Sequence, residues 1–312
     1  MPPLPPVELL LDVAFYALLV PFSVAAVVGF VSFRVAPQGA RLAGCFLAVV
    51  AGFLTANYFR QTVEFRLDPD HAWNLTEFGH RAWLALCGTT QPGGPPARYW
   101  LPWAVLFVAV VGLVIHVKKI PVAVAWFIRA AAVTVAALLL VPATLRGEAP
   151  WLWPVLAVGL LANWQILDAI RRDARPIWFP IASTALFMAG ATVLIHAHTA
   201  RFTDIATILA GCWMAMTVVA WWHGEEAGGA IPITAVGLPG LLLVTQQSTY
   251  SEVPLAAFLL VGLAPLALVP LLFVPTERRP SWTYALIGWG LLAIPMGMAM
   301  GLAMRYETLS FE

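Results

Sequence analysis

Apolar runs of about 20 residues recur along this chain, each closed by charged residues, proline or glycine. As a helix, a run of that length covers about 30 Å, the thickness of the hydrocarbon core of a bilayer. Ten runs have this character, near 9–31, 41–60, 101–117, 121–144, 151–170, 177–198, 204–222, 230–246, 253–274 and 282–304. The sequence therefore predicts an all-α fold, a polytopic helical membrane protein with about ten transmembrane helices.

Composition agrees with one transmembrane domain over residues 1–312. Hydrophobic residues make up 61% of the chain and charged residues 11%, against roughly a quarter charged in soluble domains. The long polar stretch 61–99 is expected to be an outer loop, and within it Asn74 and Glu77 have the spacing of a capping box, which predicts one short interfacial helix. Basic residues collect at span ends, so the expected partner is the lipid bilayer and not nucleic acid.

Orientation follows from the bias of lysine and arginine toward cytoplasmic loops. With the N-terminus outside, the inner loops hold the basic residues Arg34, Arg41, Lys118, Lys119, Arg171, Arg172, Arg175, Arg278 and Arg279. The short outer segments hold only Arg146, Arg201 and Arg305. We therefore predict a protein of the plasma (inner) membrane with both termini outside the cytoplasm.

The ten spans divide into two halves of five, near 1–175 and 176–312. Because five is odd, the two halves would have opposite orientations in the membrane. The third and eighth spans then occupy corresponding positions, and both are short and interrupted by proline and glycine. The eighth span, 230–246, is the weakest, because Pro239-Gly240 interrupts it. We predict that it crosses with a kink. This layout is typical of secondary transporters.

Arg129 is a cation about eight residues inside the span 121–144. A charge at that depth is costly and needs a partner. The next span runs back antiparallel and carries Asn163, Gln165 and Asp168 at a comparable depth. One interpretation is a binding site for an anionic substrate in a polar inner cavity. The other, which is the commoner arrangement, is a structural bridge between neighbouring helices.

The stretch WWHGEEAGG, residues 221–229, looks most like a reactive site among the inner loops, through His223, Glu225 and Glu226. The glutamate pair resembles the start of the EExxxR element of intramembrane CAAX-type proteases. Position 230 is alanine where that element has arginine, and no histidine follows His223, so the metal site of that family is not assembled. We interpret the stretch as a flexible inner loop, either a gate or a docking point for a basic partner.

Two further motifs concern metals and helix packing. His196 and His198 lie at one end of the span 177–198 and, with a loop histidine, have the composition of a zinc site. Their spacing matches no metal-binding signature, so neither a metal nor another cofactor is expected. Gly297 and Gly301 form a GxxxG pair that favours close packing against a partner helix.

Three classes of function fit these features. The favoured one is a permease or transporter-like protein with a polar inner cavity around Arg129, of unknown substrate. The second is a non-catalytic subunit or scaffold of a membrane complex, which needs only packing faces. The third is a membrane-embedded enzyme with an outer-face histidine site, and the absence of a strong catalytic motif argues against it.

Overall fold

The computed structural model describes residues 11–36, 38–60, 75–87, 97–117, 120–224, 228–249, 251–275 and 281–309. These residues form helices and connecting turns, and none of them forms a strand. The α-helices are α2 (Val20–Val35), α3 (Gln38–Arg60), α4 (Leu75–Cys87), α5 (Ala97–Val117), α6 (Val122–Leu140), α7 (Ala143–Glu148), α8 (Leu152–Asp173), α9 (Trp178–His196), α10 (Ala200–His223), α11 (Leu238–Ser248), α12 (Leu255–Gly262) and α13 (Trp282–Leu309). Two π-helices, η1 (Ala14–Leu19) and η3 (Ile233–Gly237), and two 3₁₀-helices, η2 (Gly228–Ala230) and η4 (Ala264–Phe273), complete the set.

Among the described residues, 9 helical stretches are long and apolar enough to cross a membrane. They are Leu11–Val35, Ala43–Arg60, Tyr99–His116, Val122–Leu140, Leu152–Asp173, Trp178–His196, Ala200–His223, Leu255–Phe273 and Trp282–Tyr306. Each corresponds to one of the predicted spans, and the short helix expected in the loop 61–99 is present as α4. The predicted class, an all-α polytopic helical membrane protein, is confirmed.

The span predicted over 121–144 ends earlier than expected. Helix α6 stops at Leu140, and Val141 has extended backbone with φ −92° and ψ 114°. The reason is Pro142, whose ring disfavours helical backbone in the residue before it. The chain turns there and enters α7, a short helix that sequence reasoning missed.

The predicted eighth span is helical but broken, and we call residues 228–248 the interrupted segment. It consists of η2, the π-helix η3 and α11. Proline has no backbone N–H and its ring clashes with the carbonyl four residues earlier, so the wider π-turn before Pro239 accommodates the ring. The segment starts just after α10 ends, and beyond its other end the hydroxyl of Thr249 donates to the carbonyl of Ala197 over 2.8 Å. It therefore runs the length of its neighbours.

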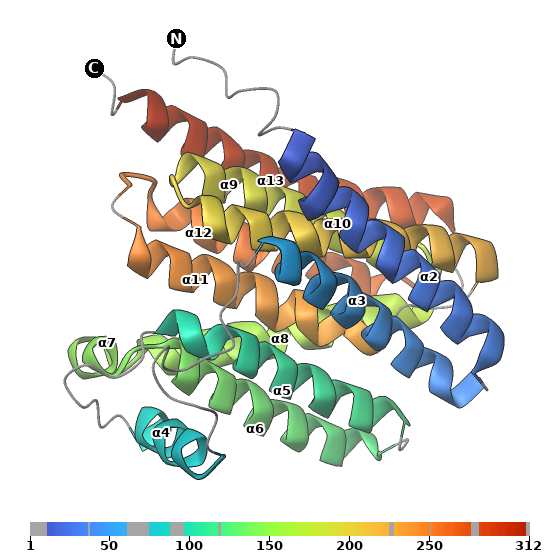
Figure 1. Cartoon of the computed structure of the whole chain (residues 1–312), viewed down its shortest axis with the longest axis horizontal. Coiled ribbons are helices and arrows are strands. Elements are labelled where there is room, and N and C mark those ends of the chain that lie inside the picture. Colours follow the sequence, from blue (N-terminus) through green and yellow to red (C-terminus); the bar gives the residue numbers. More distant parts are fainter. Residues whose placement is uncertain are drawn as a thin grey trace.

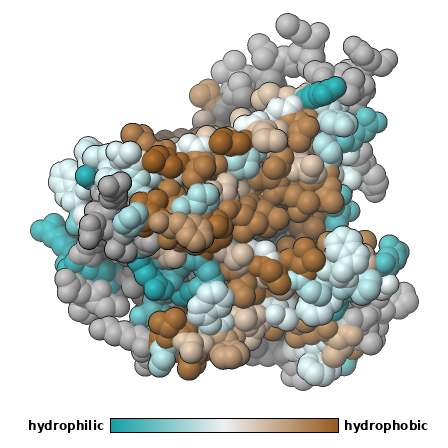
Figure 2. Space-filling model, turned by 180° about the vertical axis from the view of Figure 1, so that it is seen from behind, coloured by the Kyte–Doolittle hydropathy of each residue, from teal (hydrophilic) through white to brown (hydrophobic). Residues whose placement is uncertain are grey.

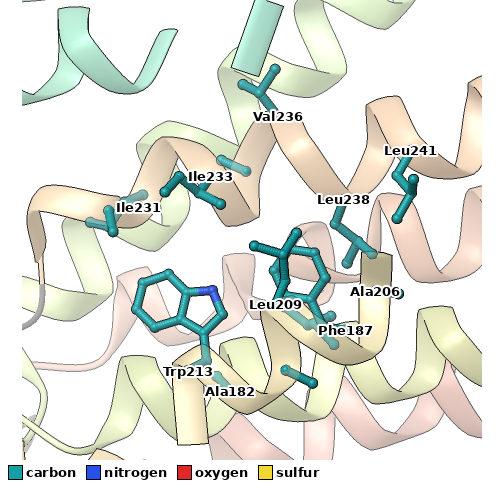
Figure 3. Packing of buried hydrophobic residues seen from close by; sticks show 14 of the residues in the cluster. Ala182, Phe187, Ala206, Leu209, Trp213, Ile231, Ile233, Val236, Leu238 and Leu241 are labelled. Carbon is teal, nitrogen blue, oxygen red and sulfur yellow. The ribbon is translucent and has the colours of Figure 1, made fainter. Parts of the chain in front are cut away.

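The interrupted segment lies inside the molecule, and its residues from Gly229 to Leu242 are all buried. Figure 3 shows the side chains of Ile231, Ile233 and Leu238 above α9 and α10, with Phe187 and Trp213 among those below them. On other sides the segment packs against α3, α5, α8 and α12. The weakest predicted span is thus the central element of the core.

The other helices form two groups on either side of this segment. Helices α5, α6 and α8 pack together in one group, whereas α2, α3, α9, α10, α12 and α13 form the larger one (Figure 1). Helices α4 and α7 lie at one end of the bundle, which we call the α4 end; η1 begins there and α13 ends there (Figure 1). We call the opposite end, where α5 and α8 finish, the Asp168 end.

The outer surface is that of a protein in lipid. On the face drawn in Figure 2, a hydrophobic band runs across the middle and hydrophilic residues gather toward both ends. Large apolar side chains are exposed on several helices, among them Phe127 (79%) and Val158 (68%). Exposed apolar side chains in such a band are satisfied by hydrocarbon and not by water.

Candidate functional site

The main polar cluster of the interior is centred on Asp168, near the end of α8, whose side chain is 1% exposed. Its carboxylate accepts hydrogen bonds from Arg129 Nη2 at 2.9 Å, from His116 Nε2 at 3.2 Å and from Arg171 Nη2 at 3.2 Å. Arg172 donates to the same carboxylate. One carboxylate therefore faces three guanidinium groups and an imidazole.

Helix geometry brings these residues together. Arg171 and Arg172 follow Asp168 by three and four residues on α8, the spacings at which side chains share a helix face. Arg129 comes from the first half of α6, and His116 comes from the last turn of α5. The cluster thus ties together the three helices of the smaller group.

Arg129 is the most deeply buried member of the three arginines, at 4% exposure. Its Nη1 donates to Oε1 of Gln165 over 2.8 Å, and its guanidinium carbon lies 5.3 Å from the ring centre of Trp164. The Nε atom has no hydrogen-bond partner. The charge is compensated by the ion pair to Asp168 and by the aromatic face, as a cation in hydrocarbon requires.

His116 connects the cluster to the backbone of its own helix. Its Nδ1 lies 2.7 Å from the carbonyl oxygen of Gly112, and a carbonyl only accepts, so Nδ1 carries a proton. Its Nε2 faces both Asp168 and Nη2 of Arg171, the latter at 3.4 Å. His116 thus joins the end of α5 to α8.

Three of the four candidates from the sequence meet here, namely Arg129, Gln165 and Asp168. Asn163 does not join them, because its amide donates to the carbonyl of Gly262 over 2.7 Å and links α8 to α12. Sequence reasoning missed His116, Arg171 and Arg172 as members. The spacing of Asp168 to the two α8 arginines was a readable signal, but the position of His116 depends on how α5 packs against α8.

A second ionic cluster lies at the α4 end. Arg60, at the end of α3, donates from Nε and Nη2 to Oδ2 of Asp204 over 3.1 and 2.5 Å, and it also pairs with Asp12. This cluster joins the start of the first span to α3 and to Asp204 near the start of α10. It therefore holds together helices of the larger group, as the Asp168 cluster holds the smaller one.

A cavity of about 210 Å³ lies between the two groups, in the half of the bundle toward the α4 end. Its lining comes from α3, α5, α10 and the interrupted segment, and it consists of Phe46, Val49, Val50, Phe53, Leu54, Tyr99, Leu101, Pro102, Val105, Leu106, Ala109, Arg201, Phe202, Ile205, Leu209, Ile233, Gly237 and Leu241. Arg129 and the other Asp168-cluster residues are not in this lining.

The remaining candidates lie apart from both clusters. His223, at the end of α10, stacks on Phe33 with ring centres 5.5 Å apart, while Glu225 and Glu226 lie outside the described residues. His196 ends α9 and His198 adopts φ 55° in the turn after it. Within the described part of the chain, no three histidine, cysteine, aspartate or glutamate side chains come close enough together to hold a metal ion.

The GxxxG pair of α13 faces outward. A side chain at Gly297 or Gly301 would meet nothing within 4 Å, so no described element packs against this pair. The pair is bare in a single chain and accessible to lipid or to another helix.

A scan against protein-family models finds no match, and a search of the curated proteins finds no significant relative. The fold and the surface nevertheless define a class. The protein is a multi-pass helical membrane protein in contact with the lipid bilayer.

Proposed function

We propose that the protein is a permease or transporter-like protein whose two helix groups move against each other about the interrupted segment. The observation that carries this proposal is the location of the cavity. Its walls come from α3 and α10 of the larger group, from α5 of the smaller group, and from the interrupted segment between them. Secondary transporters place their substrate sites at such discontinuous helices.

The two ionic clusters support this division. Each joins helices of one group: the Asp168 cluster joins α5, α6 and α8, and the Arg60 cluster joins the first span, α3 and α10. The Arg129–Asp168 pair is buried, and loss of one partner of a buried pair costs about 3–5 kcal/mol, whereas the Arg60 pairs are partly exposed and hold their helices less strongly. Motion is therefore expected between the groups and not within them.

In this proposal Arg129 holds the smaller group together and is not the substrate contact itself. Its side chain pairs with Gln165 and Asp168 and stays outside the cavity lining. The inverted relation of halves near 1–175 and 176–312 stays a prediction, as does the plasma membrane with both termini outside the cytoplasm.

The second candidate is a non-catalytic subunit of a membrane complex, and the bare Gly297–Gly301 face is the observation that favours it. Small residues on an exposed membrane helix let another helix approach closely. This candidate requires no movement between the two groups, which separates it experimentally from a permease.

The experiment uses Ala230, a 0% exposed residue of the interrupted segment that lies beyond the deep end of the cavity, toward the Asp168 end. In a background without Cys45, Cys87 and Cys212, Ala230→Cys is exposed to a small membrane-impermeant thiol reagent on each side of sealed vesicles in turn. A permease that opens toward the Asp168 end gives labelling from that side. The matched control Ala182→Cys, in α9 and also 0% exposed, stays unlabelled. If neither cysteine reacts from either side, the bundle is closed and the permease proposal is wrong.

A further inference from the structure

We infer that the Asp168 cluster holds a small inorganic anion, of the size of chloride, beside the side chains of Arg129 and Gln165. The first argument is an excess of positive charge. The cluster contains three arginines, whereas Asp168 and Asp173 are the only carboxylates on α5, α6 and α8. At least one positive charge is therefore left without a carboxylate on these three helices.

The neighbouring elements do not remove this excess. In the described part of the chain, the elements packed on α5, α6 and α8 are α4 and α7 at the opposite end, together with α3, α9, α11, η2, η3 and η4. None of the last six carries an aspartate or a glutamate. Helix α3 begins at the Asp168 end and adds a further cation there, Arg41. Positive charge inside a membrane protein is costly unless an anion compensates it.

The second argument is hydrogen bonding. Nη1 of Arg129 donates to Gln165, Nη2 donates to Asp168, and the ring of Trp164 lies beside the guanidinium carbon. Nε of Arg129 and Nε2 of Gln165 are buried, and neither has an acceptor among the described residues. Buried N–H groups are nearly always hydrogen-bonded. Two such donors, on side chains that already touch, therefore point to an acceptor from outside the described chain.

Charge and burial define the kind of acceptor. A guanidinium holds an anion more strongly than a neutral acceptor, because the hydrogen bond is charge-assisted on both sides. The side chain of Arg129 is 5% exposed, so a monatomic ion suits this position better than a bulky lipid headgroup. Arg172, which is 54% exposed, borders the cluster on its solvent side, and an ion reaches the cluster from there. The ion is a structural part of the smaller group, so this inference does not depend on movement between the groups.

The test is thermal unfolding of the full chain, purified in a neutral detergent without chloride. Midpoints are compared in sodium chloride and in sodium gluconate at the same ionic strength, since gluconate is too large for a buried position. An anion that binds the folded state stabilises it. We expect a midpoint several degrees higher in chloride, a rise that saturates with concentration, and the same rise in bromide. Equal midpoints in chloride and gluconate would overturn the inference, as would a rise produced by phosphatidylglycerol and not by chloride.

Substitutions separate a bound ion from a general salt effect. Gln165→Glu keeps an oxygen for Nη1 of Arg129 but replaces the Nε2 donor with a negative charge of its own. We expect this variant to lose the chloride effect and to be at least as stable in gluconate as the unsubstituted protein. The matched control is Gln247→Glu on α11, because Nε2 of Gln247 is also buried without an acceptor but its helix carries no charge.

The control is expected to keep the full chloride effect. A chloride effect that persists in Gln165→Glu, or one that Gln247→Glu removes equally, would overturn the inference. Chloride binding by a chain whose Ala230→Cys never reacts would leave the inference standing and remove only the permease proposal.

Discussion

At the scale of single residues, the molecule concentrates its buried charge on one acceptor. Asp168 accepts hydrogen bonds from four side chains, those of Arg129, Arg171, Arg172 and His116. Each of these donors has at least one further contact or is partly exposed. Removal of the shared carboxylate therefore leaves two buried guanidinium groups without their ion-pair acceptor. Removal of one donor leaves the carboxylate with three others.

This asymmetry predicts an order of stability. Asp168→Asn should destabilise the folded chain more than Arg129→Gln, with a loss of about 3–5 kcal/mol for the first, because it breaks a buried ionic network at its centre. Arg172→Gln, at a side chain 54% exposed, should cost about 1 kcal/mol or less. Thermal unfolding of the purified proteins in one detergent measures the order. An Arg172→Gln variant less stable than Asp168→Asn would contradict it.

The sequence was informative about the charges of this cluster that lie within apolar runs. Arg129 and Asp168 stood out because charges are costly within apolar runs, and the ion pair between them is present. His116 did not stand out, since its role depends on contact between residues 52 apart in the chain. Asn163 faces α12 and not α6, so it does not contact Arg129.

At the scale of elements, the prolines of the interrupted segment predicted its break but not its position in the bundle. Pro232 and Pro239 predicted a break, and the break is present as the π-helix between them. Nothing in the sequence places this segment at the centre, because its composition is no more apolar than that of its neighbours. Close contacts decide its position. A side chain at Gly112 of α5 would lie 2.5 Å from Cγ of Pro232 and 3.1 Å from the ring of Trp164.

This contact predicts a clear difference between two glycines in membrane helices. Gly112→Ala should lower stability by about 1–3 kcal/mol, because the proline and tryptophan rings cannot bend away and α5 must shift from the interrupted segment. Gly290→Ala on α13, where nothing lies within 4 Å, should be neutral or slightly stabilising through helix propensity. Thermal unfolding of both variants checks this. Equal losses would show that α5 does not pack on Pro232 in this way.

At the scale of the whole molecule, the packing groups do not follow the order of the chain. The first span and α3 pack against α10, far along the sequence, whereas α5 packs on α6 and α6 on α8, with further contacts from α5 to α3 and from α8 to η4. Hydropathy predicts how many helices there are and how long they are, but it carries little information about which helices are neighbours, because lipid-facing and helix-facing residues are similarly apolar. The cavity lies at the boundary between groups, so it could not be predicted from the sequence.

The central claim is that α3 and α5 belong to bodies that move relative to each other. Spin labels at Leu54→Cys on α3 and Leu106→Cys on α5, both in the lining of the cavity, report the distance between these helices in lipid vesicles. The control pair, Val110→Cys on α5 and Phe127→Cys on α6, lies within the smaller group, and both positions are exposed. All labels are placed in the background without native cysteines.

Pulsed electron paramagnetic resonance gives the distance distribution for each pair. We predict two populated distances for the pair across the cavity and one for the control pair. A single narrow distance for both pairs would contradict the account and leave a rigid bundle.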